Sequence, residues 1–295
     1  MKTPLRRVFL SILAVALLFA ALFALSHYFS EPRHGGQRLT FWLKEYYERH
    51  TPRSQEAVLA IGTNAIPTLM KLLLEERSIF LSQLIQKTRL PIEFVRDDSA
   101  WMQRRHLATI GFQVLGSNAA PVIPTLLPLL DDSPRSHLAS EALLFIGEPA
   151  LGPVRSYLAS TNSSAKRHAA QLVLSITRHA RTNLESLLAH PDPVIRGATY
   201  LYIRGPGVPH DYICDELFKG LHDPDPTAAS YAAIALRNIG NEATNALPRL
   251  YQMQTLTNTL VATELATTIK SLEKRIRLNA LPHAGAPDRE GSKDQ

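Results

Sequence analysis

The chain has 295 residues, of which 45% are hydrophobic and 20% charged, so it can bury a core in one large or two small domains, and extensive disorder is excluded. Its single cysteine, Cys214, excludes an intramolecular disulfide framework, and the lack of a CxxC pair or a tight His/Cys cluster excludes the common structural zinc sites. The formal charge of +6 gives nucleic-acid binding little support, because Lys2, Arg6 and Arg7 precede a hydrophobic leader and leave only +3 for the rest.

The leader follows the basic residues 1–7. Residues 8–25 contain nothing more polar than Ser11, and a helix of this length would measure about 27 Å, close to the roughly 30 Å of a bilayer core. We interpret residues 8–26 as a transmembrane anchor, with residues 1–7 in the cytoplasm and the body of the chain outside. Secretion after cleavage near Ser26 is the alternative, but the apolar run of 18 residues exceeds that of a typical signal peptide and favours the anchor.

Residues 27–37 are interpreted as a linker, and from residue 38 to 278 the chain repeats itself. Five similar segments end at residues 116, 147, 177, 207 and 240, so the steps between them are 31, 30, 30 and 33 residues. Weaker copies end at Gly62 and Lys270. Positions 1, 5, 8, 9 and 12 of each copy are small or apolar and fall on one face of a helix. Glycine ends most copies, which predicts left-handed C-caps.

Each copy is expected to begin with a capped helix and to be followed by a second helix. Ser133, Asp192 and Asp225 each stand before a proline, which is the usual order of an N-cap and the first helical residue. Pro67 and Pro153 precede further apolar segments after two of the copies. Because one helix pair cannot bury its apolar face alone, the units must stack. The sequence therefore predicts an all-α fold, an α-solenoid built as a superhelix of antiparallel helix pairs.

Two segments depart from the repeat. The step of 54 residues from Gly62 to Gly116 leaves room for an insertion at residues 77–100. An insertion between repeats can form a binding surface, or it can be a helix that only fills the space between two repeats, and both interpretations stay open. Residues 279–295 lack apolar periodicity and are expected to form a disordered tail.

The repeated segments resemble the HEAT-repeat family, in its short bacterial variety. The family motif Asp-Pro-x-Val-Arg-x-x-Ala-x-x-Ala-Leu-x-x-Ile-Gly is matched by the run that begins at Asp192 and by the run that ends at Gly240. The resemblance covers about residues 50–278, and the layout is also similar to membrane-anchored bacterial HEAT-repeat proteins of unknown function. It implies a single-pass protein of the bacterial cytoplasmic membrane whose body lies in the periplasm.

The chain departs from the family at the second position of the motif helix. A basic residue is present there as Arg105, Lys166 and Arg196, but Ser136 and Ala229 replace it in two copies. We therefore expect no continuous hydrogen-bonded ladder between the repeats.

The resemblance also implies that the motif helix lines a concave side, where positions 3, 6, 7 and 10 would be exposed. Aliphatic side chains mix there with a tyrosine and several arginines, which is typical of a protein or peptide interface rather than of a phosphate-tracking groove. The alternative is that the aliphatic members are buried, as such residues at helical spacing usually are. The hypothetical binding residues are His106, Ile110, His137, Glu141, Leu144, Arg167, Gln171, Leu174, Tyr200, Leu201, Arg204, Ile234 and Arg237.

Catalytic motifs are weak or lacking. Ser163 and Lys166 have the Ser-x-x-Lys spacing of serine acylases without its companion elements, and Ser163 is better interpreted as a helix N-cap. His106 and His137 could face each other from neighbouring helices, with Glu141 one turn further on, but no further ligand at local spacing is evident. We therefore expect no metal, no cofactor and no catalytic residue.

The sequence favours a non-enzymatic scaffold, held at the membrane by residues 8–26, that binds a protein or peptide and no nucleic acid. The alternative is a lyase- or isomerase-like enzyme on a HEAT-like repeat fold, with a groove site around His106, His137 and Glu141.

Overall fold

The chain is almost entirely helical where its structure is described. A computed structural model describes residues 31–75, 98–131, 134–205, 207–239, 247–253 and 259–280. Within these ranges, the only sheet has two strands of two residues each. The all-α prediction is therefore confirmed apart from this short sheet. The chain forms two compact units, Met1–Ala150 and Leu151–Gln295, and the division falls inside helix α9 (Glu148–Ser156).

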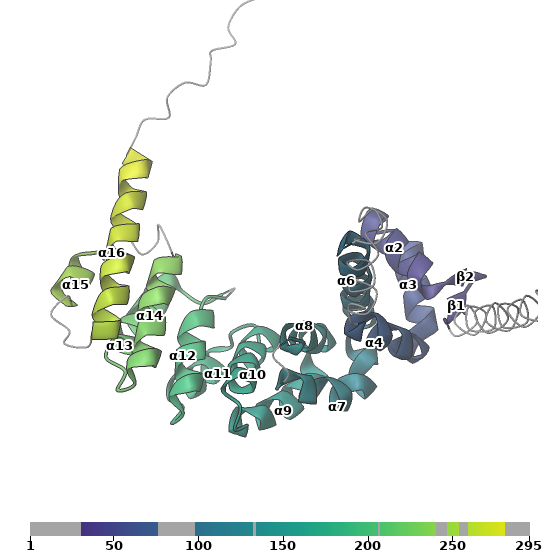
Figure 1. Ribbon diagram of the computed structural model, residues 1–295, viewed down its shortest axis with the longest axis horizontal. Coiled ribbons are helices and arrows are strands. Elements are labelled where there is room, and N and C mark those ends of the chain that lie inside the picture. The colour runs from purple at the N-terminus through teal and green to yellow at the C-terminus, as the bar shows by residue number, and fades with distance from the viewer. Residues whose placement is uncertain are drawn as a thin grey trace, which may run out of the picture. The chain divides into compact units, whose positions relative to one another are not determined.

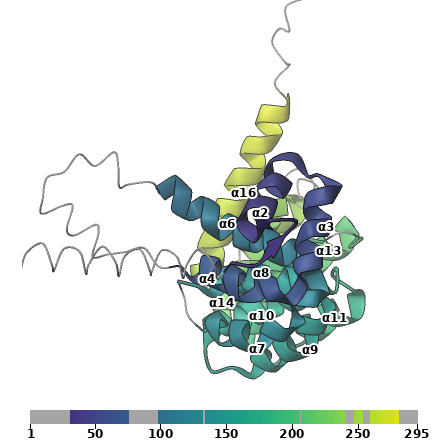
Figure 2. The ribbon, with the colours of Figure 1, turned by 90° about the vertical axis from the view of Figure 1, so that its right-hand side faces the viewer.

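The described part of the first unit begins with a β-hairpin and continues as helices (Figure 1). Helices α2 and α3 pack against each other, as Figure 2 also shows, and α4 packs against α6. The elements in chain order are β1 (Arg33–His34), β2 (Gln37–Arg38), α2 (Leu39–Arg49), α3 (Pro52–Ile61), the 3₁₀ helix η1 (Gly62–Ala65), α4 (Ile66–Leu74), α6 (Asp98–Leu115), the 3₁₀ helix η3 (Gly116–Val122), α7 (Ile123–Leu126), the 3₁₀ helix η4 (Leu127–Leu130) and α8 (Ser136–Ile146).

In the second unit the repeat helices alternate with the second helices of the pairs. Helix α10 packs against α12, α12 against α14, and α14 against α16, and Figure 1 shows the last three side by side. The elements after α9 are the 3₁₀ helix η5 (Tyr157–Ala159), α10 (Ser163–Ile176), α11 (Arg181–Leu188), α12 (Pro193–Tyr202), α13 (His210–Gly220), α14 (Pro226–Ile239), α15 (Leu247–Gln252) and α16 (Thr259–Ala280).

Small side chains bring the repeat helices of the second unit close together. Ala198 and Ala232 are fully buried. A Cβ atom on Gly197 would lie 2.7 Å from the Tyr231 ring and 3.3 Å from the Cα atom of Ala228, so α12 and α14 meet here at backbone distance. The small residues that recur in each copy therefore lie where neighbouring helices touch, because larger ones would force the helices apart.

Side-chain caps begin the repeat helices α10, α12 and α14. Asp192 accepts a hydrogen bond of 2.8 Å from the backbone N–H two residues ahead, and Asp225 accepts bonds of 3.0 and 2.8 Å from the N–H groups two and three residues ahead. Both caps are as predicted. The prediction for α10 is wrong by one residue, since Asn162 and not Ser163 is its N-cap. The predicted cap at Ser133 lies outside the described residues.

Two helices end at a glycine with an unusual backbone conformation. Gly62 follows α3 with φ 58° and ψ −138°, and Gly147 follows α8 with φ 77° and ψ −136°. The positive φ is as predicted, but ψ is far from the left-handed helical value of about +47°. Both glycines instead adopt the mirror image of the extended conformation, which side chains with a Cβ atom rarely reach.

The observed elements differ from the predicted boundaries near the start of the described chain. The proposed linker, residues 27–37, contains strand β1 and the first residue of β2, so a folded hairpin precedes the helices. Of the proposed insertion, residues 77–100, the last three belong to α6 and the others lie outside the described residues. The leader, up to residue 30, and residues 281–295 of the proposed tail also lie outside them.

Two described helical stretches, Pro52–Leu74 and Met102–Leu130, are long and apolar enough to cross a membrane by length and composition alone. Neither is one continuous α-helix, because 3₁₀ segments that begin with a positive-φ glycine interrupt both. Some of their large side chains, such as Leu69 and Phe112, are fully buried in the first unit, whereas Leu59 and Met102 are exposed. The anchor proposed for residues 8–26 lies outside the described residues.

Candidate functional site

The residues predicted to bind a partner have different exposures. In the first unit His106, His137, Glu141 and Leu144 are exposed. In the second unit Arg167 and Arg204 are exposed, and partial exposure is found for Gln171, Leu201, Ile234 and Arg237. Much of the predicted surface therefore contacts solvent in each unit.

Three of the predicted binding residues are buried, so their assignment to an exposed surface is wrong. Ile110 and Tyr200 are each 6% exposed, and Leu174 is fully buried. Helix α6, which carries Ile110, packs against α2, α3 and α4 as well as α8, and this packing covers more than one of its faces. The Tyr200 ring lies against Gly220, where a Cβ atom would come within 2.8 Å of it, and the tyrosine hydroxyl donates to Asp223.

Helices α2, α6 and α8 carry a set of neighbouring exposed residues that we call the first-unit face. The Tyr47 and His106 rings meet edge to face with centroids 5.0 Å apart, which joins α2 to α6. The hydroxyl of Thr109 donates to Glu141 Oε2 at 3.4 Å, which joins α6 to α8. Spacings of three or four residues keep the other members on the same sides of their helices. The face consists of Tyr47, Met102, His106, His137, Glu141 and Leu144.

Large apolar side chains on this face remain in contact with solvent. Met102 is 61% exposed, Tyr47 44% and Leu144 37%. The repeat pattern does not point to Tyr47, which precedes every copy, or to Met102, which precedes the first position of its copy. The four-residue spacing of Met102 and His106 is the signal that could have extended the predicted surface by one turn.

In the second unit an ion pair joins α12 to the turn before α14. The Arg196 guanidinium donates to both carboxylate oxygens of Asp223, from Nη2 at 2.6 Å and from Nε at 2.7 Å. Its Nη1 donates to the carbonyl oxygens of His190 and Pro191, each at 2.9 Å, and the Tyr200 hydroxyl donates to Asp223 at 3.1 Å. The Asp223 side chain is 2% exposed and that of Arg196 14%, so this cluster is nearly closed to water.

The surroundings of this cluster shift the pKa values of two of its members. Burial by itself would raise the pKa of the Asp223 carboxyl, but the hydrogen bonds from Arg196 and from the backbone N–H of Asp225 outweigh it and lower the pKa. Burial raises the pKa of Tyr200, and the negative charge of Asp223 raises it further. The cluster therefore holds one cation, one anion and a neutral hydroxyl at neutral pH, and it serves to join helices.

A ladder of such links runs through part of the second unit. Lys166 in α10 pairs at 2.5 Å with Asp192, which directly precedes α12. This ion pair lies one repeat earlier in the chain than the pair of Arg196 and Asp223. The next copy has Ala229 at the equivalent position. Helix α14 is linked to α16 instead by Arg237 and Glu264 at 3.1 Å. The ladder is thus interrupted at the residue where the sequence predicted a break.

The residues of the alternative enzyme hypothesis form no enclosed site. His106 packs on Tyr47, Glu141 accepts from Thr109, and His137 is exposed on α8. Among the residues that the structure describes, no three His, Cys, Asp or Glu side chains are grouped so that they could hold a metal ion. The geometry therefore gives no support to a groove reaction at these residues.

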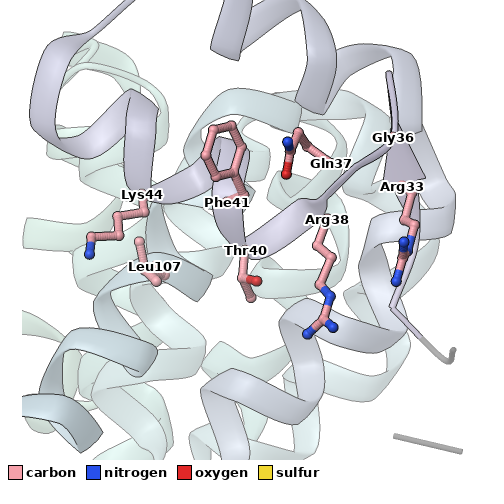
Figure 3. Close-up of a pocket in the computed structure, with 8 residues that line it drawn as sticks. All are labelled: Arg33, Gly36, Gln37, Arg38, Thr40, Phe41, Lys44 and Leu107. Atoms are coloured by element: carbon pink, nitrogen blue, oxygen red, sulfur yellow. The ribbon is translucent and has the colours of Figure 1, made fainter. Parts of the chain in front are cut away.

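An open cavity of about 340 Å³ lies beside the hairpin of the first unit (Figure 3). The hairpin, the first two turns of α2 and one residue of α6 form its walls. Three of the lining residues are cations and none is a carboxylate. Sequence reasoning missed this cavity because it took the hairpin for a linker. The lining residues are Arg33, Gly36, Gln37, Arg38, Thr40, Phe41, Lys44 and Leu107.

Comparisons with known proteins give no family for the chain. No protein-family model matches it, and no curated protein matches it. Among solved structures it is similar to an engineered protein whose crystal structure was a target of the Northeast Structural Genomics Consortium, with 15% identity, over 80% of this chain and 97% of that chain, at a TM-score of 0.30. A likeness at this score carries no conclusion about fold or function.

Proposed function

We propose that the chain is a non-enzymatic scaffold of HEAT-like repeats, tethered to the bacterial cytoplasmic membrane, that binds a protein or peptide partner in the periplasm. The observation that carries the proposal is the first-unit face, where Tyr47, Met102 and Leu144 are more than a third exposed while the large side chains around them are buried. Aromatic residues and methionine are enriched in protein interfaces, and a set of them left in water on neighbouring helices favours a partner that covers it.

The rim of the first-unit face suits a specific contact. His106, His137 and Glu141 are exposed among the apolar members and offer hydrogen-bond donors and acceptors. Polar groups around a buried apolar centre are the usual arrangement in protein interfaces. The face therefore offers both parts of an interface, and neither part requires a chemical reaction.

The packing of the second unit supports an α-solenoid. The helices that carry the repeat, α10, α12, α14 and α16, contact each other in chain order. In a solenoid each repeat contacts only its neighbours, and the repeats build long surfaces that proteins use for binding. The apolar run of residues 8–25 and the cations before it support the tether and the orientation of the body.

The proposal is tested with the full-length protein in its native membrane. Tyr47 is replaced by a photo-crosslinking amino acid, and covalent adducts are quantified with and without Leu144→Glu. A charge on an apolar contact residue of an interface should reduce the adducts about 30-fold, since such a residue contributes on the order of 2 kcal/mol and each 1.4 kcal/mol is a factor of ten. Leu144 is 37% exposed, so its replacement should leave the helical content unchanged, as circular dichroism would show.

Leu59→Glu is the matched control. Leu59 is 40% exposed on α3 of the same unit but is not a member of the first-unit face. This substitution should leave the adducts at position 47 unchanged. If Leu144→Glu and Leu59→Glu give the same adducts as the native chain, the first-unit face is not the binding surface.

A further inference from the structure

The C-terminal end of helix α16 extends beyond the helices that support it. The buried hydroxyl of Thr268 donates to the carbonyl oxygen of Ala233 at 2.9 Å and joins the middle of α16 to α14. Among the α16 residues whose burial is described, Leu272 is the last buried one, and none of residues 273–278 is buried. Figure 1 shows this end of the helix extending past α14 and α15. The helix is thus anchored along its first part and open to water at its end.

Residues 273–278, which we call the α16 tip, carry an excess of positive charge. The tip contains one carboxylate, that of Glu273, which accepts a hydrogen bond from the Tyr251 hydroxyl on α15. Its three cations are exposed, and none of them forms an ion pair with a carboxylate of the described residues. These cations are Lys274, Arg275 and Arg277. Basic residues at this end of a helix also complement its dipole, so the charge by itself does not require a partner.

The apolar members of the α16 tip are what the helix dipole does not explain. Ile276 is 41% exposed and Leu278 is 56% exposed. Two residues that are two positions apart lie about 200° from each other around a helix, so these side chains point to nearly opposite sides. A single docked protein helix would cover one of them and leave the other in water. The fluid boundary region of a bilayer surrounds an inserted helix end and covers both.

We infer that the α16 tip inserts into the surface of a membrane that contains anionic phospholipids. The three cations would then lie among the phosphate groups, and arginine can donate two parallel hydrogen bonds to such a group. The two apolar side chains would enter the boundary between headgroups and acyl chains, as those of interfacial helices do. An acidic protein would match the charge but not the two opposite apolar sides. The inference is independent of the proposed scaffold function, because the tip shares no residue with the first-unit face.

Fluorescence titration tests the inference on the full-length protein held in phosphatidylcholine nanodiscs. An environment-sensitive fluorophore is attached at Leu278→Cys in a Cys214→Ser background, and vesicles of equal parts phosphatidylglycerol and phosphatidylcholine are added. We expect a blue shift that saturates and gives a partition coefficient. Vesicles of phosphatidylcholine alone should bind about 100-fold more weakly, since each of three basic residues gains about 5-fold at an anionic surface.

The same label at Thr263→Cys is the control for position. Thr263 is exposed on α16 about 22 Å before Leu278 along the helix axis. The label should therefore stay in water and show no shift when the tip inserts.

Two changes within the tip test its two kinds of side chain. Lys274→Gln combined with Arg275→Gln should lower the partition coefficient about 25-fold. Ile276→Ser should lower it about 5-fold, because less than half of the isoleucine is left to be buried. The matched control is Arg167→Gln combined with Arg178→Gln, which removes the same charge from exposed positions elsewhere in the second unit and should have no effect.

The inference is overturned if the label at position 278 shows no shift with the anionic vesicles. It is equally overturned if the Lys274 and Arg275 variant binds as tightly as the control variant, or if Ile276→Ser has no effect. Poly-glutamate is the second probe, and a shift with it but not with the vesicles would assign the tip to an acidic protein instead. None of these measurements involves the first-unit face, so a failure here leaves the proposed function untouched.

Discussion

At the residue scale, the Asp223 carboxylate accepts several hydrogen bonds in a nearly closed cluster. It accepts from Arg196 and Tyr200 through its side chain and from the backbone N–H of Asp225 at 2.9 Å. A buried ion pair adds little over apolar packing, but the removal of one partner leaves the other charge unpaired. The stability of the α12–α14 contact should therefore depend strongly on this single residue.

We expect Asp223→Ala to lower the free energy of unfolding by about 3 kcal/mol, the low end of the cost of breaking a buried pair, because Arg196 is 14% exposed. Urea titration followed by circular dichroism measures it. Asp215→Ala is the control, since Asp215 and Arg249 also pair, at 2.9 Å, but with side chains 61% and 53% exposed. An exposed pair contributes less than about 1 kcal/mol. Equal losses in the two variants would contradict the role of burial.

The same substitution should alter the pH dependence of stability. The pKa of Asp223 is lowered in the folded chain, below the value of about 3.9 for an unfolded aspartate. Its contribution is therefore complete above about pH 4 and is lost as the pH falls through the folded pKa. The native chain should lose more stability than Asp223→Ala as the pH falls from 5 to 2, because this range extends below the unfolded pKa. Part of the loss should persist in the variant, because hydrogen bonds from Lys166 and Val194 also lower the pKa of Asp192, against the effect of its burial. Parallel pH curves would contradict the assignment to Asp223.

At the element scale, side-chain caps begin some of the repeat helices, and a glycine ends α8. Asp192 and Asp225 satisfy free backbone N–H groups where α12 and α14 begin. Gly147 lets the chain leave α8 and enter α9 at once, because its positive φ reverses the chain direction without a longer loop. The short turn between these helices thus depends on one residue that lacks a Cβ atom.

Gly147→Ala should therefore destabilise the chain by about 1–2 kcal/mol, the cost of forcing a side chain into this conformation. A Cβ atom there would meet no other atom within 4 Å, so backbone strain is the only cause. Gly152→Ala is the matched control, because Gly152 is also surrounded by open space but lies inside α9 without a positive φ. It should change the free energy of unfolding by less than about 0.5 kcal/mol, because the crowding of the new Cβ atom by Pro153 offsets the gain in helix propensity. Urea titration compares the two, and a neutral effect at Gly147 would contradict the strain.

At the scale of the whole molecule, the proposed function depends on the side of the membrane on which the body lies. The cations Lys2, Arg6 and Arg7 precede the apolar run, and such residues stay in the cytoplasm. Both the first-unit face and the hairpin cavity belong to the part of the chain that follows the run. The proposed topology places them together outside the cytoplasm.

Cysteine labelling tests this topology. Glu148 is exposed, so Glu148→Cys in a Cys214→Ser background should react with a membrane-impermeant maleimide on intact spheroplasts. Thr3→Cys in the same background is the control, and it should react only after lysis because it precedes the apolar run. Labelling of Glu148→Cys only after lysis would place the body in the cytoplasm and contradict the proposed topology.

The repeat helices and their starting points were predictable, because the causes act within a few residues. The sequence shows an apolar periodicity of 3.6 residues, an aspartate before a proline and a glycine at the end of most copies. Helices α12 and α14 begin where Asp192 and Asp225 predict. The break in the ladder at Ala229 was visible for the same reason. The hairpin was missed because its two strands are only two residues long and carry no apolar alternation.

Exposure on the predicted surface was not predictable to the same degree. Ile110, Leu174 and Tyr200 occupy helical positions opposite the repeat core, yet they are buried. Helix α6, which carries Ile110, packs against four other helices, and the Tyr200 ring lies against Gly220 of α13. Local periodicity specifies which residues share a side of a helix, since that depends only on the helical rise and turn. Which sides meet water depends on how many neighbours each helix has in space. The all-α character and the helix starts could therefore be predicted from the sequence. The first-unit face and the cationic cavity could not, because they depend on the tertiary packing of segments that are distant in the chain.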